Sequence, residues 1–295
     1  MKTNLVVVVL SCCISAVVIA QEKGKSDVSV PEGIVYEKDV VFGRGGDTEL
    51  HLDIARPEKA GKALPCIVVI HGGGWRGGNF KLHVPQILEF AKAGYVSATI
   101  QYRLVPVGRW PAQIEDVKCA VRYLRAQSDK YGIDKSRFGA IGFSAGAHLS
   151  MLLGTMDEKD GLEGNGGNPR ESSKVQAVVS YFGPTNLAAQ DFPANVNGMI
   201  YDFLGALPEE KPENFKAASP VSYIDKSDAP TLMFMGTKDR LVPYNQAYLL
   251  ADALTQAGVA GRIELLLGAD HGWGGAELTR TVVASKAFFD EQLKK

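Results

Sequence analysis

Ser144 is the residue of this chain whose surroundings most clearly favour chemistry. It is the centre of a Gly-Phe-Ser-Ala-Gly sequence over residues 142–146, which follows a short apolar run. A Gly-x-Ser-x-Gly pattern in that position is typical of a sharp turn between a strand and a helix, where the two glycines let both elements approach closely. Such a turn exposes the serine hydroxyl, so the pattern predicts a nucleophilic serine.

A serine hydroxyl becomes a good nucleophile only when a nearby base removes its proton, and that base is usually histidine. Two histidines follow Ser144 in the chain. His148 lies on the same expected helix as the serine and cannot reach its free side, so we predict a structural role for it. His271 follows an expected strand, at the sheet edge where open α/β folds bind ligands, and is the predicted base.

The base in turn requires an acid that fixes its tautomer and stabilises the imidazolium. Asp239 follows an apolar strand and a short turn, which places its carboxylate at the carboxyl end of that strand. Asp270 adjoins His271 and would have to fold back onto its own neighbour. We therefore predict Asp239 as the acid and a loop-capping role for Asp270.

Attack by Ser144 on a carbonyl carbon would create an oxyanion, which needs preorganised hydrogen-bond donors. Three consecutive glycines follow His71, and without β-carbons the backbone amides of this loop can turn toward such an oxygen. We predict Gly73, Gly74 and Ala145 as the donors. A phosphate-binding loop is the alternative, but no Lys-Ser or Lys-Thr pair follows the glycines.

The elements that must position these residues are predicted from hydrophobic periodicity. Residues 64–70 form a continuous apolar run, as expected for a strand buried on both faces of a parallel sheet. Strand-like and helix-like segments then alternate, which favours a mostly parallel sheet with helices on both faces. The expected strands are 35–42, 49–54, 64–70, 95–102, 138–143, 175–182, 231–235 and 263–267, and the expected helices begin after Pro111, at Ala145, and near Ala247 and Leu278.

Two stretches interrupt this alternation. Residues 156–173 are rich in Gly, Asn, Asp and Glu, which indicates a solvated loop. Residues 187–228 follow an expected strand but mix prolines with aromatic residues, as an inserted lid would. Because no internal repeat is visible, we expect one α/β domain over residues 34–295 that includes this small lid.

The first twenty residues differ in kind from the rest. Lys2 precedes an almost wholly apolar run over residues 5–20, as in a signal peptide. As a helix this run would span about 24 Å, less than the ~30 Å hydrocarbon core, so we expect no stable membrane span. We expect residues 1–20 to be a signal peptide, residues 21–33 a flexible mature N-terminus, and the protein to be exported to the periplasm or the exterior.

Cysteine usage and charge limit the remaining classes. Lipid attachment at Cys12 is disfavoured because the apolar stretch before it is very short. Cys66 and Cys119 lie in apolar segments and are expected to be buried, with a single disulfide as the alternative. The formal net charge of −1 gives no electrostatic reason to expect nucleic acid as a partner. The scattered histidines show no metal-ligand spacing, and nothing predicts an oligomeric state.

Together the motifs resemble the α/β-hydrolase superfamily, and more closely its hormone-sensitive-lipase-like carboxylesterases and the related acetylxylan and feruloyl esterases. The motifs that carry the resemblance are residues 71–75, 102–104, 142–148, 236–239 and 270–272. The resemblance runs from about Val35 to the end of the chain and implies an eight-stranded, mostly parallel sheet, an acyl-serine intermediate and no cofactor. Ser144, Asp239 and His271 also follow the chain order of that superfamily.

The resemblance also bears on the substrate. Lipase-like members usually carry a longer helical cap at the N-terminus, and the short segment before the first expected strand here favours the exported carbohydrate-esterase relatives. Trp75 and Trp273 adjoin the glycine loop and the base, and Tyr201 belongs to an aromatic wall of the lid. We predict these three residues as substrate contacts, with core packing as the alternative.

These expectations combine into one function with two rivals. We expect an exported serine carboxylesterase that hydrolyses short-chain or polysaccharide-linked esters carrying acetyl or feruloyl groups. An arylformamidase or other amidase of the same fold is the first alternative, because the same side chains cleave activated amides. A non-catalytic binding protein on the same scaffold is the second, although such proteins usually lack one of the three catalytic residues.

Overall fold

The structure is a computed structural model that describes residues 28–189 and 191–295. The predicted signal peptide, residues 1–20, lies outside the described residues, as do residues 21–27 of the predicted mature N-terminus. In the described part of the chain, no helix has both the length and the apolar composition that crossing a bilayer requires.

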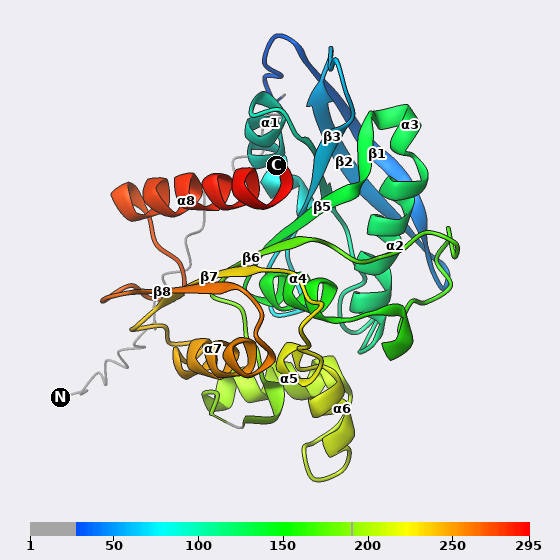
Figure 1. The fold of residues 1–295 in the computed structure, drawn as a ribbon. Helices are drawn as coiled ribbons and strands as arrows, with labels where there is room; N and C mark the ends of the chain where they lie inside the picture. The colour runs from blue at the N-terminus through cyan, green and yellow to red at the C-terminus, as the bar shows by residue number, and fades with distance from the viewer. Residues whose placement is uncertain (1–27, 190) are drawn as a thin grey trace, which may run out of the picture.

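An eight-stranded sheet runs through the molecule in the order β1-β2-β4-β3-β5-β6-β7-β8 (Figure 1). Strand β2 pairs antiparallel with β1 and β4, and the other neighbouring pairs are parallel, as the alternation of strands and helices predicts. The strands are β1 (Ile34–Gly45), β2 (Thr48–Pro57), β3 (Leu64–Ile70), β4 (Val96–Ile100), β5 (Ile133–Phe143), β6 (Ala177–Tyr181), β7 (Thr231–Gly236) and β8 (Gly261–Leu266).

Helices cover both faces of this sheet, and the buried side chains accordingly form two clusters. On one face lie α1 (Val84–Lys92) and α8 (Gly275–Leu293). The other face carries α2 (Ala112–Ala126), α4 (Ala145–Thr155) and α7 (Asn245–Ala257), and the short α3 (Ser128–Tyr131) follows α2. Strand β3 serves both clusters because alternate side chains of a strand point to opposite faces: Ile67 belongs to the first and Val68 to the second.

Some of the predicted elements are extended, and the helix between β3 and β4 was not predicted. Strands β1 and β2 are longer than predicted, so the hairpin turn shrinks to Gly46 and Asp47, where Gly46 takes a φ of 58° that glycine adopts readily. Helix α1 was not predicted, although its buried residues Ile87, Leu88 and Ala91 have helical spacing. The helix has only nine residues and lies between two strands, so its periodicity was too short to recognise in the sequence.

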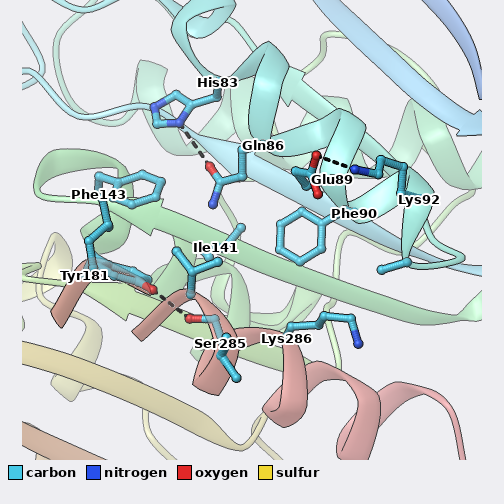
Figure 2. A pocket seen from close by; sticks show the side chains of 14 residues that line it. His83, Gln86, Glu89, Phe90, Lys92, Ile141, Phe143, Tyr181, Ser285 and Lys286 are labelled. Atoms are coloured by element: carbon cyan, nitrogen blue, oxygen red, sulfur yellow. Dashed lines mark hydrogen bonds and ion pairs between the residues drawn. The ribbon is translucent and has the colours of Figure 1, made fainter. Parts of the chain in front are cut away.

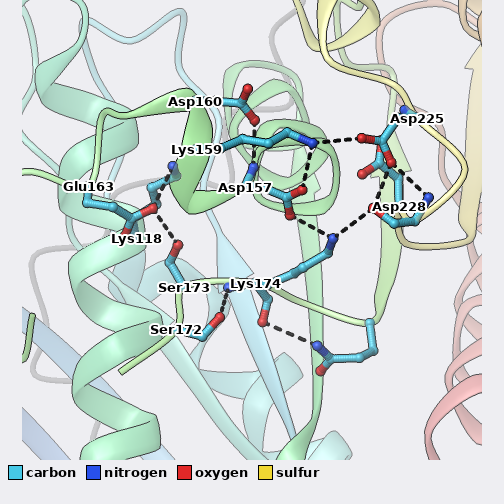
Figure 3. Close-up of polar contacts among 12 residues, drawn as sticks. Lys118, Asp157, Lys159, Asp160, Glu163, Ser172, Ser173, Lys174, Asp225 and Asp228 are labelled. Carbon is cyan, nitrogen blue, oxygen red and sulfur yellow. Dashed lines mark hydrogen bonds and ion pairs between the residues drawn. The ribbon is translucent and has the colours of Figure 1, made fainter. Parts of the chain in front are cut away.

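The stretch 156–173 is mostly loop with exposed or half-buried residues, as its composition indicates, and it is also tied to the helix layer. It contains a short 3₁₀ helix, η2 (Glu158–Asp160), and its acidic side chains form ion pairs with α2 and neighbouring loops (Figure 3). Glu163 accepts from the buried Lys118 Nζ at 2.8 Å and from Arg122 at 2.7 Å. The polar residues of this stretch therefore attach it to the helix layer.

The stretch 187–228 lies between β6 and β7. It contains α5 (Ala194–Leu204), α6 (Pro212–Ala217) and the 3₁₀ helices η3 (Leu187–Ala189) and η4 (Pro220–Ser222). Helix α5 packs onto the core through Ile200 and Phe203, and Figure 1 shows α5 and α6 together at one end of the molecule. This segment is called the insertion below.

Both cysteines in the described residues are buried and free. Cys66 belongs to β3 and Cys119 to α2, and burial raises the pKa of both thiols, that of Cys119 to about 11. The prediction that both cysteines are buried is confirmed, and they do not form the disulfide that was the alternative.

Candidate active site

Ser144 occupies the turn between β5 and α4, as the Gly-x-Ser-x-Gly pattern predicts. Its backbone has φ 52° and ψ −118°, a strained conformation for a residue with a side chain. Two hydrogen bonds hold it there: its amide donates to the Tyr181 carbonyl at 2.9 Å, and its carbonyl accepts from the His148 amide at 3.0 Å. Strain fixed in this way places the hydroxyl at the tip of the turn.

The two glycines around the serine are required by close packing. A β-carbon at Gly146 would collide with the carbonyl oxygens of Ile70 and His71, and one at Gly142 would collide with the carbonyl of Gly146. Helix α4 therefore begins directly against the end of β3. This contact brings the serine next to the glycine loop that follows β3.

Asp239 and His271 form a close pair. The Nδ1 atom of His271 lies 2.8 Å from the Oδ2 atom of Asp239, whose side chain is fully buried. The other carboxylate oxygen accepts from the amides of Leu241 and Val242 at 2.8 and 2.9 Å. With both oxygens occupied, Asp239 is fixed in position and orients the imidazole with Nδ1 as the donor.

Asp270 is used differently, as its position next to the histidine predicts. Its carboxylate accepts from the amides of His271 and Arg240 at 2.8 and 3.1 Å, and from Arg240 Nε at 2.6 Å. The hydrogen bond from the Arg240 side chain is the main reason that the pKa of Asp270 falls to about 2. Asp270 thus caps its own loop and leaves the imidazole to Asp239.

Ser144 and His271 line the same cavity, of about 390 Å³. Gly73, Gly74 and Ala145, the predicted donors to an oxyanion, line it as well. The remaining wall residues are mostly apolar and come from the loop after β3, the ends of β5 and β6, the insertion and the loop after β7: Gly72, Trp75, Phe143, Phe182, Pro184, Phe192, Val196, Met199, Ile200, Leu241 and Val242.

His71 supports the glycine loop, residues 72–74, on the side away from the cavity. Its Nδ1 lies 2.7 Å from the Gly72 carbonyl, and its ring stacks on Tyr102 with centroids 4.4 Å apart. Burial lowers the pKa of His71 to about 4, so the ring is neutral at pH 7 and donates through a single nitrogen. Gly73 and Gly74 have φ values of 116° and 59°, which glycine adopts without strain.

His148 is fully buried away from the cavity. Its Nε2 donates to the Ala218 carbonyl at 2.6 Å, and burial lowers its pKa to about 4. Its ring meets the edge of Trp75 at a centroid distance of 5.3 Å. The predicted structural role agrees with this position.

Of the three aromatic residues predicted as substrate contacts, only Trp75 lines the cavity. Its ring is otherwise buried and stacks on Phe203 of α5 at 4.3 Å. Trp273 packs on Tyr181 and donates to Thr281 at 3.0 Å, and Tyr201 packs on Phe215. The structure thus places Trp273 and Tyr201 in packing layers outside the cavity wall.

Sequence reasoning missed Phe182, which packs on the His271 ring at a centroid distance of 4.6 Å. It follows directly after β6, at the carboxyl edge of the sheet where ligand contacts gather, and that position could have identified it. Leu241 and Val242 were also missed. Two apolar residues in a loop after Asp239 could equally well pack against the core, so the sequence does not mark them as cavity residues.

Two other concave regions lack this combination of groups. A groove of about 670 Å³ between α1 and α8 contains His83 and Ser285, but these side chains bond to Gln86 and Tyr181 and not to each other (Figure 2). A hollow of about 360 Å³ beside the 156–173 stretch is lined by Glu163 and other paired charges. Neither presents a serine–histidine pair.

The strand order, the serine turn and the acid–histidine pair define an α/β-hydrolase, and solved structures agree. A truncated carbohydrate esterase from gut microbiota matches with a TM-score of 0.78 and 29% identity, over 88% of this chain and 97% of that one. An acetyl ester-xyloside bifunctional hydrolase from Caldicellulosiruptor lactoaceticus matches with a TM-score of 0.72 and 26% identity, over 83% of this chain and 89% of that one. The predicted α/β-hydrolase fold is therefore confirmed.

Sequence comparison identifies the family. The model of the family described as BD-FAE matches residues 52–254, and the chain belongs to that family. The esterase LipC of Mycobacterium tuberculosis is 30% identical over 84% of this chain and 62% of LipC. The chain spans 53–62% of the length of three mycobacterial relatives of this kind, all named as esterases or as a carboxylic ester hydrolase.

Proposed function

We propose that this protein is a serine carboxylesterase that forms an acyl-serine intermediate. The observation that carries the proposal is the single cavity lined by Ser144 and His271, with Asp239 bonded to the far side of the imidazole. The esterase names of its relatives and of the matching structures support the same reaction.

The reaction follows from the roles of these groups. His271 Nε2 takes the Ser144 proton as the oxygen attacks the ester carbonyl, and Asp239 stabilises the resulting imidazolium. The tetrahedral adduct collapses, and His271 returns the proton to the leaving alcohol. Water, deprotonated by the same histidine, then attacks the acyl-serine and releases the carboxylic acid.

The oxyanion that forms in both steps would be bound by main-chain amides. We assign this role to Gly73, Gly74 and Ala145, which line the cavity beside Ser144. Each such donor typically contributes about 3 kcal/mol to the transition state, a factor of roughly a hundred in rate. The buried His71 and Tyr102 behind the loop would keep the donors aimed, because the Tyr102 hydroxyl donates to the His71 carbonyl at 3.0 Å.

We propose small acyl groups, acetyl above all, on sugar or other alcohols as the substrates. The cavity is small and its wall largely apolar, which suits a short acyl group. One matching structure is named a carbohydrate esterase and another an acetyl ester-xyloside hydrolase. The insertion would act as a lid, since Phe192, Val196 and Met199 contribute to the cavity wall. We expect Met199→Ala to change the KM of at least one ester. An unchanged KM for every ester would contradict the role of the insertion as a lid.

A substrate panel tests this function. We expect turnover of acetylated xylan and of p-nitrophenyl acetate, with slower or no turnover of methyl ferulate and N-formylkynurenine. A fluorophosphonate probe should label the wild type and leave Ser144→Ala unlabelled. Faster cleavage of N-formylkynurenine than of any ester would favour an amidase, and equal labelling of both proteins would favour a binding protein.

We also propose export. The support is Lys2 followed by the apolar run over residues 5–20, with cleavage after Ala20. Mass spectrometry of the protein expressed with its full sequence is expected to find a chain that begins at Gln21. Recovery of the uncleaved chain alone would contradict the proposal.

A further inference from the structure

A second cavity extends to Phe143, the residue that directly precedes Ser144. This groove, of about 670 Å³, lies on the sheet face that α1 and α8 cover (Figure 2). Its floor includes Ile141 of β5 and Tyr181 of β6, and its sides include Phe90 of α1 and Val282 of α8. Val282 and its neighbour Val283 are 50% and 63% exposed, so the groove is open on the α8 side, where apolar side chains lie beside the charged Lys286.

The groove and the catalytic cavity share one wall residue, Phe143. Phe143 directly precedes Ser144, and two residues earlier Ile141 lies on the same sheet face, as the alternation of a strand requires. The groove therefore runs along β5 toward the serine turn and ends at the Phe143 ring.

The ring is fixed on both sides. His83 stacks on it with centroids 4.8 Å apart and an interplanar angle of 14°, and Tyr181 packs at 5.0 Å. Each neighbour is itself held: His83 Nδ1 lies 3.1 Å from Gln86 Oε1, and the Tyr181 and Ser285 hydroxyls share a buried hydrogen bond of 2.8 Å. Two anchored neighbours therefore hold the Phe143 ring in place at the end of the groove.

We propose that Phe143 determines acyl-chain length by separating the catalytic cavity from this apolar groove. With the ring in place, an acyl group attached to Ser144 ends at the wall, and short chains are favoured. Without the ring, the groove becomes an extension of the catalytic cavity that accepts a linear alkyl chain. This inference rests on the proposed esterase function and names the specificity of the same site.

The test compares kcat/KM for p-nitrophenyl acetate, butyrate and octanoate. In Phe143→Ala we expect the octanoate-to-acetate ratio to rise by about tenfold or more, because added methylenes of the substrate then enter apolar space. The ratio is independent of how much of a variant is folded, since both esters meet the same enzyme. Phe143→Val, a smaller truncation, is expected to raise the butyrate-to-acetate ratio more than the octanoate-to-acetate ratio.

A second substitution identifies where the longer chain goes. Val282→Trp fills the groove far from the serine, so in the Phe143→Ala background it should remove most of the gain for octanoate. In the wild type the same change should leave the ratio unaltered.

The outcomes separate this inference from the function on which it rests. An active Phe143→Ala or Phe143→Val enzyme with an unchanged chain-length profile would overturn the role of Phe143. A gain that survives Val282→Trp would overturn the role of the groove. Absence of turnover on every ester by the wild type would instead refute the esterase function.

Discussion

Two carboxylates of this molecule have nearly the same contact and serve different purposes. Asp239 lies 2.8 Å from His271 Nδ1 at the carboxyl edge of the sheet, and Glu163 lies 2.8 Å from Lys118 Nζ on α2. Glu163 borders a hollow of about 360 Å³, and His271, the partner of Asp239, borders one of similar size, about 390 Å³. Neither the distance nor the volume distinguishes them.

The difference lies in what remains unpaired. Glu163 also accepts from Arg122 and from Ser173, and Lys118 donates in addition to the Gly161 carbonyl, so this cluster is internally complete. At the other site His271 uses Nδ1 for Asp239, and among the described residues no group bonds to its Nε2. A free nitrogen on a fixed imidazole that lines the same cavity as Ser144 is available for proton transfer, whereas a closed ion cluster only stabilises the fold.

The largest effect should come from the acid of the proposed site. Asp239→Asn is expected to lower kcat by about 10⁴-fold, because the amide favours the wrong tautomer of His271. Asp270→Asn, the matched control one residue from the histidine, should retain most of the activity, since its carboxylate faces Arg240. Steady-state kinetics on p-nitrophenyl acetate decide between them, and equal losses would show that the acid is wrongly assigned.

Glu163→Gln should affect stability and leave catalysis alone. Removing this charge leaves the buried Lys118 and Arg122 without their carboxylate, and such losses destabilise a fold by about 3 kcal/mol. Urea unfolding measures the change, while kcat of the folded variant should stay within about twofold. The control is Glu158→Gln on exposed η2, expected within about 0.5 kcal/mol of the wild type. A kcat loss comparable to that of Asp239→Asn would contradict the purely structural role of Glu163.

The smallest effect is the pH dependence of the Glu163 cluster. Burial alone would raise the pKa of Glu163, but the hydrogen bond and charge of Lys118, with Ser173 and Arg122, outweigh it and hold the pKa below its usual value. A lowered folded-state pKa means that the cluster contributes its stability above the unfolded pKa of about 4.3 and loses it as pH falls through the folded value. The stability difference between wild type and Glu163→Gln should therefore be constant from pH 7 to 5 and shrink below pH 4. A constant difference down to pH 3 would contradict the ion-pair assignment.

Local patterns predicted the parts of the molecule that depend on neighbours in sequence. Residues 64–70 coincide with β3 because a strand buried on both faces needs an uninterrupted apolar run. The glycines around Ser144 identify the turn, since close packing admits no side chain there. Asp239 and His271 could be proposed because each follows a strand whose carboxyl end faces the same edge.

The parts that were missed depend on partners distant in sequence. Whether Trp273 enters the cavity or packs on Tyr181 is decided by α8, which supplies the Thr281 acceptor for its indole. The composition of the stretch around Glu163 does not reveal that this carboxylate pairs with the buried Lys118, 45 residues away in the chain. Long-range pairing of this kind leaves no periodicity for sequence reasoning to detect.

The stack of Trp75 on Phe203 has a consequence for protein engineering. It joins the loop after β3 to α5, and the Phe203 carbonyl also accepts from the Trp110 amide at 2.8 Å. A chimaera that received the 187–228 segment of another family member without an aromatic residue at position 203 would leave the indole of Trp75 unsupported. Segment and loop are therefore best transplanted as one unit.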